Sequence, residues 1–168
     1  MRKILVLLFF IAAFQNISFG QDTINWKTDY KLKWQDFQGA ADAASPHSAL
    51  THYTISYRYS YVGTTLQFTV SCYFDKPQSW KKTNIDDPLL AHEQGHFDIA
   101  EITAKRLAKA FAAYKLAPAT VDADIKNIYQ ATMNDGYAMQ DKYDNETDHS
   151  RNKQQQEAWL KTIKSQLQ

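Results

Sequence analysis

The stretch HEQGHFDIAE, residues 92–101, decides how the rest of this sequence is interpreted. If it is helical, His92 and His96 lie on one face, one turn apart. Two imidazoles so placed can bind one Zn²⁺ ion, each at roughly 2.0–2.1 Å. Glu93 stands beside them, where its carboxylate can take a proton from an attacking water. The pattern therefore predicts two metal ligands and a general base.

The sequence around this stretch argues against a chance match on a solvated helix face. Apolar residues recur at helical spacing and would face a core. Asp87-Pro88 is typical of an N-cap followed by proline at the first helical position. Gly95 costs about 1 kcal/mol relative to alanine inside a helix, so it indicates close approach of substrate or of a packed strand. The apolar stripe consists of Leu89, Phe97, Ala100, Ala104, Leu107 and Phe111.

Residues 1–20 have the features of a signal peptide. Two basic residues precede an apolar run, residues 4–14, that is too short to span a bilayer as a mature helix. Residues 18–20 provide a small-residue cleavage site. We therefore expect residues 21–168 to form one secreted or periplasmic domain without stable membrane insertion. A retained N-terminal anchor is the alternative.

Charge and cysteine content exclude several classes of protein. The chain has 19 basic and 18 acidic residues, so nothing indicates a nucleic-acid partner or a polybasic membrane patch. Cys72 is the single cysteine, so no internal disulfide forms. It lies among apolar residues in a strand-like pattern, which favours a place in the core over a role as a nucleophile.

Alternating residues predict the strands. Runs at 50–61 and 64–74 are joined by a short glycine-containing link and predict a β-hairpin. The first run carries a row of tyrosines that we expect to form a packed face of the sheet. A shorter alternation at 30–34 suggests a first strand or an extended arm. A loop rich in alanine, serine and aspartate covers residues 39–48.

Helical patterns occupy the second half of the chain. The motif helix is expected over residues 88–114. A second helix follows Thr120 and should end between residues 136 and 143, and a third covers residues 152–167. Strands followed by helices predict an α+β fold, in which a small antiparallel sheet packs against the motif helix and two further helices.

The motif helix does not supply a third protein ligand, although a catalytic zinc usually has three and one open position. Glu101 lies about 140° around the helix from His96 and cannot join the site. No third histidine follows at the spacing of metzincins. Asp144, Glu146 and His149, all in a polar stretch between the last two helices, remain open as candidates.

Three segments together resemble DUF922, bacterial secreted proteins of unknown function that are predicted to be zinc-dependent proteases. They are LKWQDF (32–37), HEQGHFDIAE (92–101) and YDNETDH (143–149). The resemblance implies a zincin-like fold, export and metallopeptidase activity, and it favours His149 as the third zinc ligand. Ser150 departs from the glycine expected after that histidine.

The leading hypothesis is a secreted zinc metallopeptidase, a hydrolase whose partner is a peptide or protein substrate. In it His92, His96 and His149 bind Zn²⁺, and Glu93 is the general base that activates water. One alternative is a non-catalytic zinc-binding module. Another is an envelope interaction module that uses the tyrosine-rich sheet without a metal.

Overall fold

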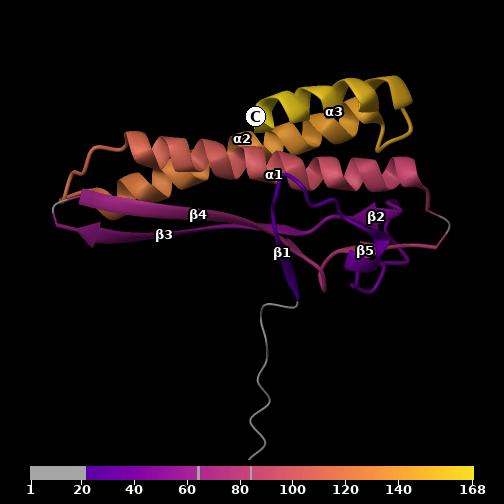
Figure 1. The fold of residues 1–168 in the computed structure, drawn as a ribbon, viewed down its shortest axis with the longest axis horizontal. Coiled ribbons are helices and arrows are strands. Elements are labelled where there is room, and N and C mark those ends of the chain that lie inside the picture. Colours follow the sequence, from indigo (N-terminus) through magenta and orange to yellow (C-terminus); the bar gives the residue numbers. More distant parts are fainter. Residues whose placement is uncertain (1–21, 64, 84) are drawn as a thin grey trace, which may run out of the picture.

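The computed structural model describes residues 22–63, 65–83 and 85–168, so the predicted signal peptide lies outside the described residues. The fold is α+β, with a small antiparallel sheet and three helices (Figure 1). The strands are β1 (Thr23–Asn25), β2 (Ala49–Leu50), β3 (Tyr53–Val62), β4 (Thr65–Asp75) and β5 (Trp80–Lys81). The helices are α1 (Asp87–Ala113), α2 (Val121–Thr147) and α3 (Lys153–Leu167), with one 3-10 turn, η1 (Trp34–Asp36).

The predicted hairpin is confirmed. β3 and β4 pair antiparallel from Tyr53 opposite Phe74 to Val62 opposite Thr65, and β1 pairs with the other edge of β4. β2 and β5 form a separate two-stranded ribbon. The tyrosine row packs as expected in its middle, where the Tyr57 ring lies 5.1 Å from the Phe111 ring.

Residues 30–34 were predicted to form a first strand or an extended arm, and of these alternatives the strand is wrong. This segment instead leads into η1, because Asp36 closes a local turn. The Asp36 carboxylate accepts hydrogen bonds from the Lys33 backbone N–H and the Tyr30 hydroxyl, both at 2.9 Å. Side-chain bonds of this kind compete with strand pairing.

α1 is the central element of the fold. It contacts β3 and β4 on one side and α2 and α3 on the other (Figure 1). One apolar cluster, which includes Phe97, Leu107 and Phe111, faces the hairpin. A second cluster of Ile99, Ile102, Tyr143 and Ile163 faces α2 and α3. A helix covered on two sides has few positions left for solvent, which explains why nearly all of residues 92–100 are buried.

α1 begins one residue earlier than the sequence suggested. Asp86 is the N-cap, with an extended backbone and a carboxylate that accepts the Leu89 N–H at 3.0 Å. Asp87 is already helical and adds negative charge to the first turn, where the helix dipole favours it.

α2 is longer than predicted, since it continues through Gly136 to Thr147. A Cβ on Gly136 would lie 2.7 Å from the hydroxyl oxygen of Thr103 on α1, so this glycine permits helix packing and does not end the helix. The extension places Asp144 on a helix and not in the polar loop that the sequence suggested.

Gly95 allows α1 and α2 to approach closely. A Cβ there would lie 2.7 Å from Cζ of Tyr143, which is fully buried. The close neighbour is therefore a tyrosine from another helix, and neither a strand nor a substrate is needed to explain the glycine.

One further feature fits the sequence analysis. Cys72 is buried, and burial raises the pKa of its thiol well above the usual range, which makes it a poor nucleophile. Among the described residues, no helix combines the length and the apolar character needed to cross a membrane.

The Gly95→Ala substitution should destabilise the protein by about 1–3 kcal/mol because the added methyl overpacks against Tyr143. Helix propensity alone would give the opposite sign, a gain of about 1 kcal/mol. Urea denaturation of the metal-free protein measures the effect. Ala108→Gly, on the exposed face of the same helix, is the control and should cost about 1 kcal/mol. A Gly95→Ala variant more stable than the parent would contradict the packing argument.

Candidate metal centre

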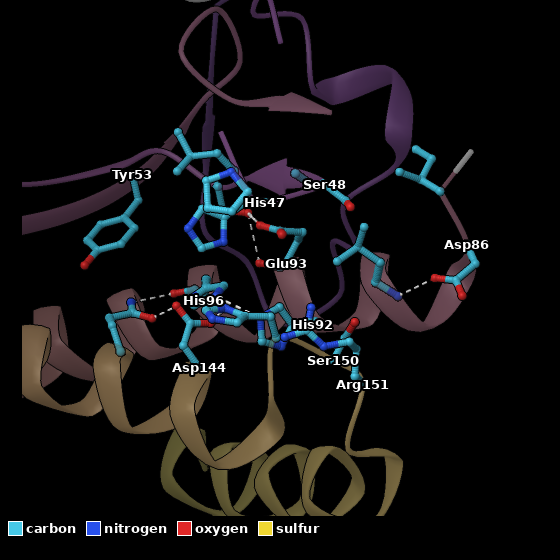
Figure 2. Close-up of a pocket in the computed structure, with 18 residues that line it drawn as sticks. His47, Ser48, Tyr53, Asp86, His92, Glu93, His96, Asp144, Ser150 and Arg151 are labelled. Atoms are coloured by element: carbon cyan, nitrogen blue, oxygen red, sulfur yellow. Dashed lines mark hydrogen bonds and ion pairs between the residues drawn. The ribbon is translucent and has the colours of Figure 1, made fainter. Parts of the chain in front are cut away.

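Two helices face each other across the site, and each contributes residues one turn apart. α1 presents His92 and His96, and α2 presents Asp144 (Figure 2). Gln140 precedes Asp144 by one turn of α2 and contacts His96. His92 meets Asp144 and His96 meets Gln140, so the two helices run antiparallel here. On each helix the two residues are four positions apart, so they lie on the same face of that helix.

Three ligand atoms converge in this arrangement. The Nε2 atoms of His92 and His96 are 3.1 Å apart, and each lies 3.0 Å from Oδ1 of Asp144. Ligand atoms around a tetrahedral zinc ion with bonds of roughly 2.0–2.1 Å are about 3.3 Å apart. The three atoms thus have nearly the spacing of one face of such a coordination tetrahedron.

Gln140 fixes the tautomer of His96. Its side-chain N–H donates to the His96 backbone carbonyl at 2.9 Å, which leaves Oε1 facing Nδ1 of the same histidine at 2.7 Å. An amide oxygen only accepts, so Nδ1 must carry the proton. In the neutral ring Nε2 then has a free lone pair, directed at the convergence point.

A second chain of hydrogen bonds fixes the tautomer of His92. The Tyr143 hydroxyl donates to the His92 carbonyl at 3.2 Å and accepts from the side-chain N–H of Gln156 at 2.5 Å. Gln156 Oε1 is thereby left to accept the Nδ1 proton of His92 at 2.9 Å. Partners of this kind orient metal-binding imidazoles. α3, which carries Gln156, is therefore part of the support for the site.

The electrostatics of the cluster favour a cation. Burial alone would raise the pKa of Asp144, but the Nε2 atoms of His92 and His96, which donate to its carboxylate when the rings are protonated, hold that pKa well below its usual range. Burial opposes the charged form of His96, but the hydrogen bond to Asp144 and the charge of Glu93 outweigh it and raise its pKa. The carboxylate thus stays ionised, and a positive charge beside it is stabilised.

Glu93 lies at the wall of the same cavity (Figure 2). Its side chain is almost completely buried, and its Oε2 accepts a hydrogen bond of 2.6 Å from the hydroxyl of Thr51. Thr51 follows β2, so the strand ribbon holds the carboxylate from the side opposite α2. The cavity has a volume of about 570 Å³, and Tyr53 and His47 also line it.

His149 reaches the site from the turn after α2. Its Nδ1 is 3.4 Å from Asp144 Oδ1, and its backbone N–H donates to the Asp144 carbonyl at 3.0 Å. His92, Asp144 and His149 form a group whose ligand atoms lie within 4.8 Å of one another and could hold a metal ion. The prediction that His149 is a ligand stays a prediction, and Asp144 is the nearer donor to both motif histidines.

Glu146, the remaining sequence candidate, lies elsewhere. Glu146 accepts a hydrogen bond from the Trp159 indole at 2.7 Å and does not line the cavity. Asp98 accepts from Trp26 and Gln94, which makes it a structural residue of α1. Gln140 and Gln156 were missed, because a glutamine in a helix carries no signal until its partner is known.

Gln156→Leu should weaken Zn²⁺ binding by about 10–100-fold, because His92 loses the acceptor that orients its ring. Competition against a chromophoric chelator measures the affinity. Gln155→Leu changes an exposed neighbour on α3 in the same way and should leave the affinity unchanged. Equal affinities in the two variants would refute the supporting role of Gln156.

Zn²⁺ affinity should fall as the pH is lowered, starting above the ordinary imidazole pKa of 6.5. The pKa of His96 is raised, so its proton competes with the metal at a higher pH than in a free imidazole. Asp144 contributes no such loss in this range because its pKa is lowered. Calorimetry in two buffers of different ionisation enthalpy should detect proton release on binding near neutral pH. Binding independent of pH from 6 to 8 would count against these roles.

Comparison with known proteins identifies one related family. Neither the curated proteins nor the solved structures provide a match. A family profile described as bacterial protein of unknown function (DUF922) matches residues 16–150, which include the whole of α1 and α2 and the His149 turn. This match covers most of the chain, and the protein therefore belongs to the DUF922 family.

Proposed function

We propose that this protein is a zinc-dependent metallopeptidase. The observation that carries the proposal is the convergence of His92 Nε2, His96 Nε2 and Asp144 Oδ1 at mutual distances of 3.0–3.1 Å, with Glu93 beside them at a cavity. Two neutral imidazoles and one carboxylate are a ligand set found in catalytic zinc sites, which keep a further position open.

The donors fit a zinc ion chemically. The lone pairs of both Nε2 atoms and a carboxylate oxygen point at one place, and such an arrangement is unfavourable unless a proton or a cation lies there. A bound zinc ion would supply a Lewis acid that polarises a carbonyl and makes water acidic near neutral pH.

Glu93 provides the proton transfers. Its carboxylate lies next to His92 in sequence, and the Thr51 hydroxyl holds one of its oxygens. It can accept a proton from water during attack on a peptide carbonyl and pass that proton to the departing amine. The Tyr53 phenol lines the same cavity, and burial raises its pKa to about 12, so it stays protonated and can donate a hydrogen bond to substrate.

Further parts of the proposal concern fold type and location. A motif helix beneath an antiparallel sheet, with the next donor supplied by a later helix, supports a zincin-like fold. The features of residues 1–20 support export to the periplasm or the medium, where the substrate would be a peptide or protein.

A non-catalytic zinc-binding module is the second candidate. One observation favours it: His149 forms a group with His92 and Asp144 that could hold a metal ion, and it would be a fourth protein ligand if it joined the three converging atoms. Four protein ligands close a zinc site. The two candidates differ in what Glu93 does, since a closed structural site has no use for a general base.

Glu93→Gln should lower the hydrolysis of a susceptible peptide by about 10²–10⁴-fold while Zn²⁺ affinity stays close to that of the parent. The amide keeps an oxygen that accepts from Thr51 but cannot take a proton. Peptides from a mixed library, analysed by mass spectrometry after incubation with zinc-loaded protein, identify the substrate for the rate measurement. Glu157→Gln, an exposed change on α3, is the control and should be fully active. Equal activity of the Glu93→Gln variant and the parent would eliminate the peptidase proposal.

A further inference from the structure

The site has one potential donor more than an open catalytic zinc centre requires. His92, His96 and Asp144 already provide three converging ligand atoms. His149 Nδ1 lies 3.4 Å from Asp144 Oδ1, close to the separation of about 3.3 Å between two ligands of one tetrahedral zinc ion. His149 groups with His92 and Asp144, with ligand atoms within 4.8 Å of one another, so it lies beside the three converging atoms as the next available donor.

The backbone that carries His149 differs from that of the other three donors. Those three lie within helices, whereas His149 is the middle of three successive non-glycine residues with positive φ: Asp148 at 49°, His149 at 49° and Ser150 at 76°. Side chains with a Cβ are disfavoured in this region, and such conformations cluster at ligand clamps and switches. Ser150 stands where the family resemblance led us to expect glycine, and its φ gives the physical reason for that expectation.

The His149 side chain is also the least constrained of the four. The rings of His92 and His96 are each held at Nδ1 by a glutamine oxygen, at 2.9 Å and 2.7 Å. The His149 side chain is 38% exposed, and its ring packs edge-on against His47 with centroids 4.9 Å apart. Both rings line the cavity, so open space adjoins the His149 ring.

We infer that His149 is a displaceable fourth ligand, which closes the metal site of the resting protein and leaves when a substrate carbonyl or another ligand binds. The inference rests on the metal centre of the proposed function. A resting site with four protein ligands can then still open a position for catalysis. His149 is the ligand that leaves, because it alone lies on a strained, partly exposed turn. The apparent affinity of any added ligand is then reduced by the fraction of molecules in which His149 is bound.

The test uses Co²⁺ as a spectroscopic probe in the mature chain and acetohydroxamate as the added ligand. His149→Ala should still bind Co²⁺, but its visible spectrum should change because one nitrogen ligand is lost. Acetohydroxamate should bind the His149→Ala protein at least about tenfold more tightly than the parent, as expected if fewer than one parent molecule in ten is open. His47→Ala is the matched control: it removes the ring that packs on His149 but leaves the donor group intact, so the cobalt spectrum should be that of the parent.

Two results would overturn the inference. A His149→Ala protein with the parent's cobalt spectrum and hydroxamate affinity would show that His149 is no ligand, even if peptide hydrolysis is impaired. A His149→Ala protein that no longer binds Co²⁺ would show an indispensable ligand and not a displaceable one. Neither readout needs turnover, so a parent that binds Co²⁺ with the predicted spectra but cleaves no peptide would overturn only the peptidase proposal.

Discussion

The contact between Gly95 and Tyr143 is the constraint on which the site depends. With no side chain at position 95, α2 approaches α1 until the Tyr143 ring lies against its backbone. His92 and His96 lie three residues before Gly95 and one residue after it, so this spacing brings both rings against Asp144. Interiors are packed as densely as organic crystals, so a widened helix spacing would not be absorbed elsewhere. The proposed metal ligands are thus positioned by a packing contact between helices as much as by their own chemistry.

The polar groups between the helices form one connected network. Buried polar atoms are costly unless they are hydrogen-bonded. Here the Gln156 side chain accepts from the His92 ring and donates to the Tyr143 hydroxyl, which in turn donates to the His92 backbone carbonyl. A fully connected network specifies one arrangement of the side chains. The negative charge of Asp144 is not neutralised within this network. A bound metal ion would neutralise it and would displace protons from the ligands. A metal bound there would couple its binding to folding through the same few atoms.

Much of the fold could be predicted from the sequence, because the spacing of apolar residues along the chain reflects the local geometry of strands and helices. The hairpin and the three helices follow from alternation and from helical spacing, and the motif helix presents His92 and His96 as expected. The end of α2 could not be predicted, since Gly136 is a weak helix residue whose place depends on Thr103 of another helix. For the same reason Asp144 was one of three open candidates: which carboxylate or imidazole meets α1 depends on the packing of α2, and no local pattern contains that information.

The two apolar clusters lie on opposite sides of α1, and only one of them is in contact with the candidate metal site. The stability of the two halves of the molecule should therefore depend on that site to different degrees. The hairpin-side cluster, with Phe97 and Phe111, does not involve α3, whereas the other cluster joins Tyr143 and Ile163 beside the imidazoles. Native proteins open in cooperative units. A bound ligand stabilises the folded form of the unit that holds it, so that unit opens more readily when the ligand is absent. Amide hydrogens of α3 would then exchange readily in the apoprotein while those of β3 and β4 remain protected. The carboxyl-terminal helix would act as a ligand-dependent folding unit on a scaffold that keeps its shape without the metal.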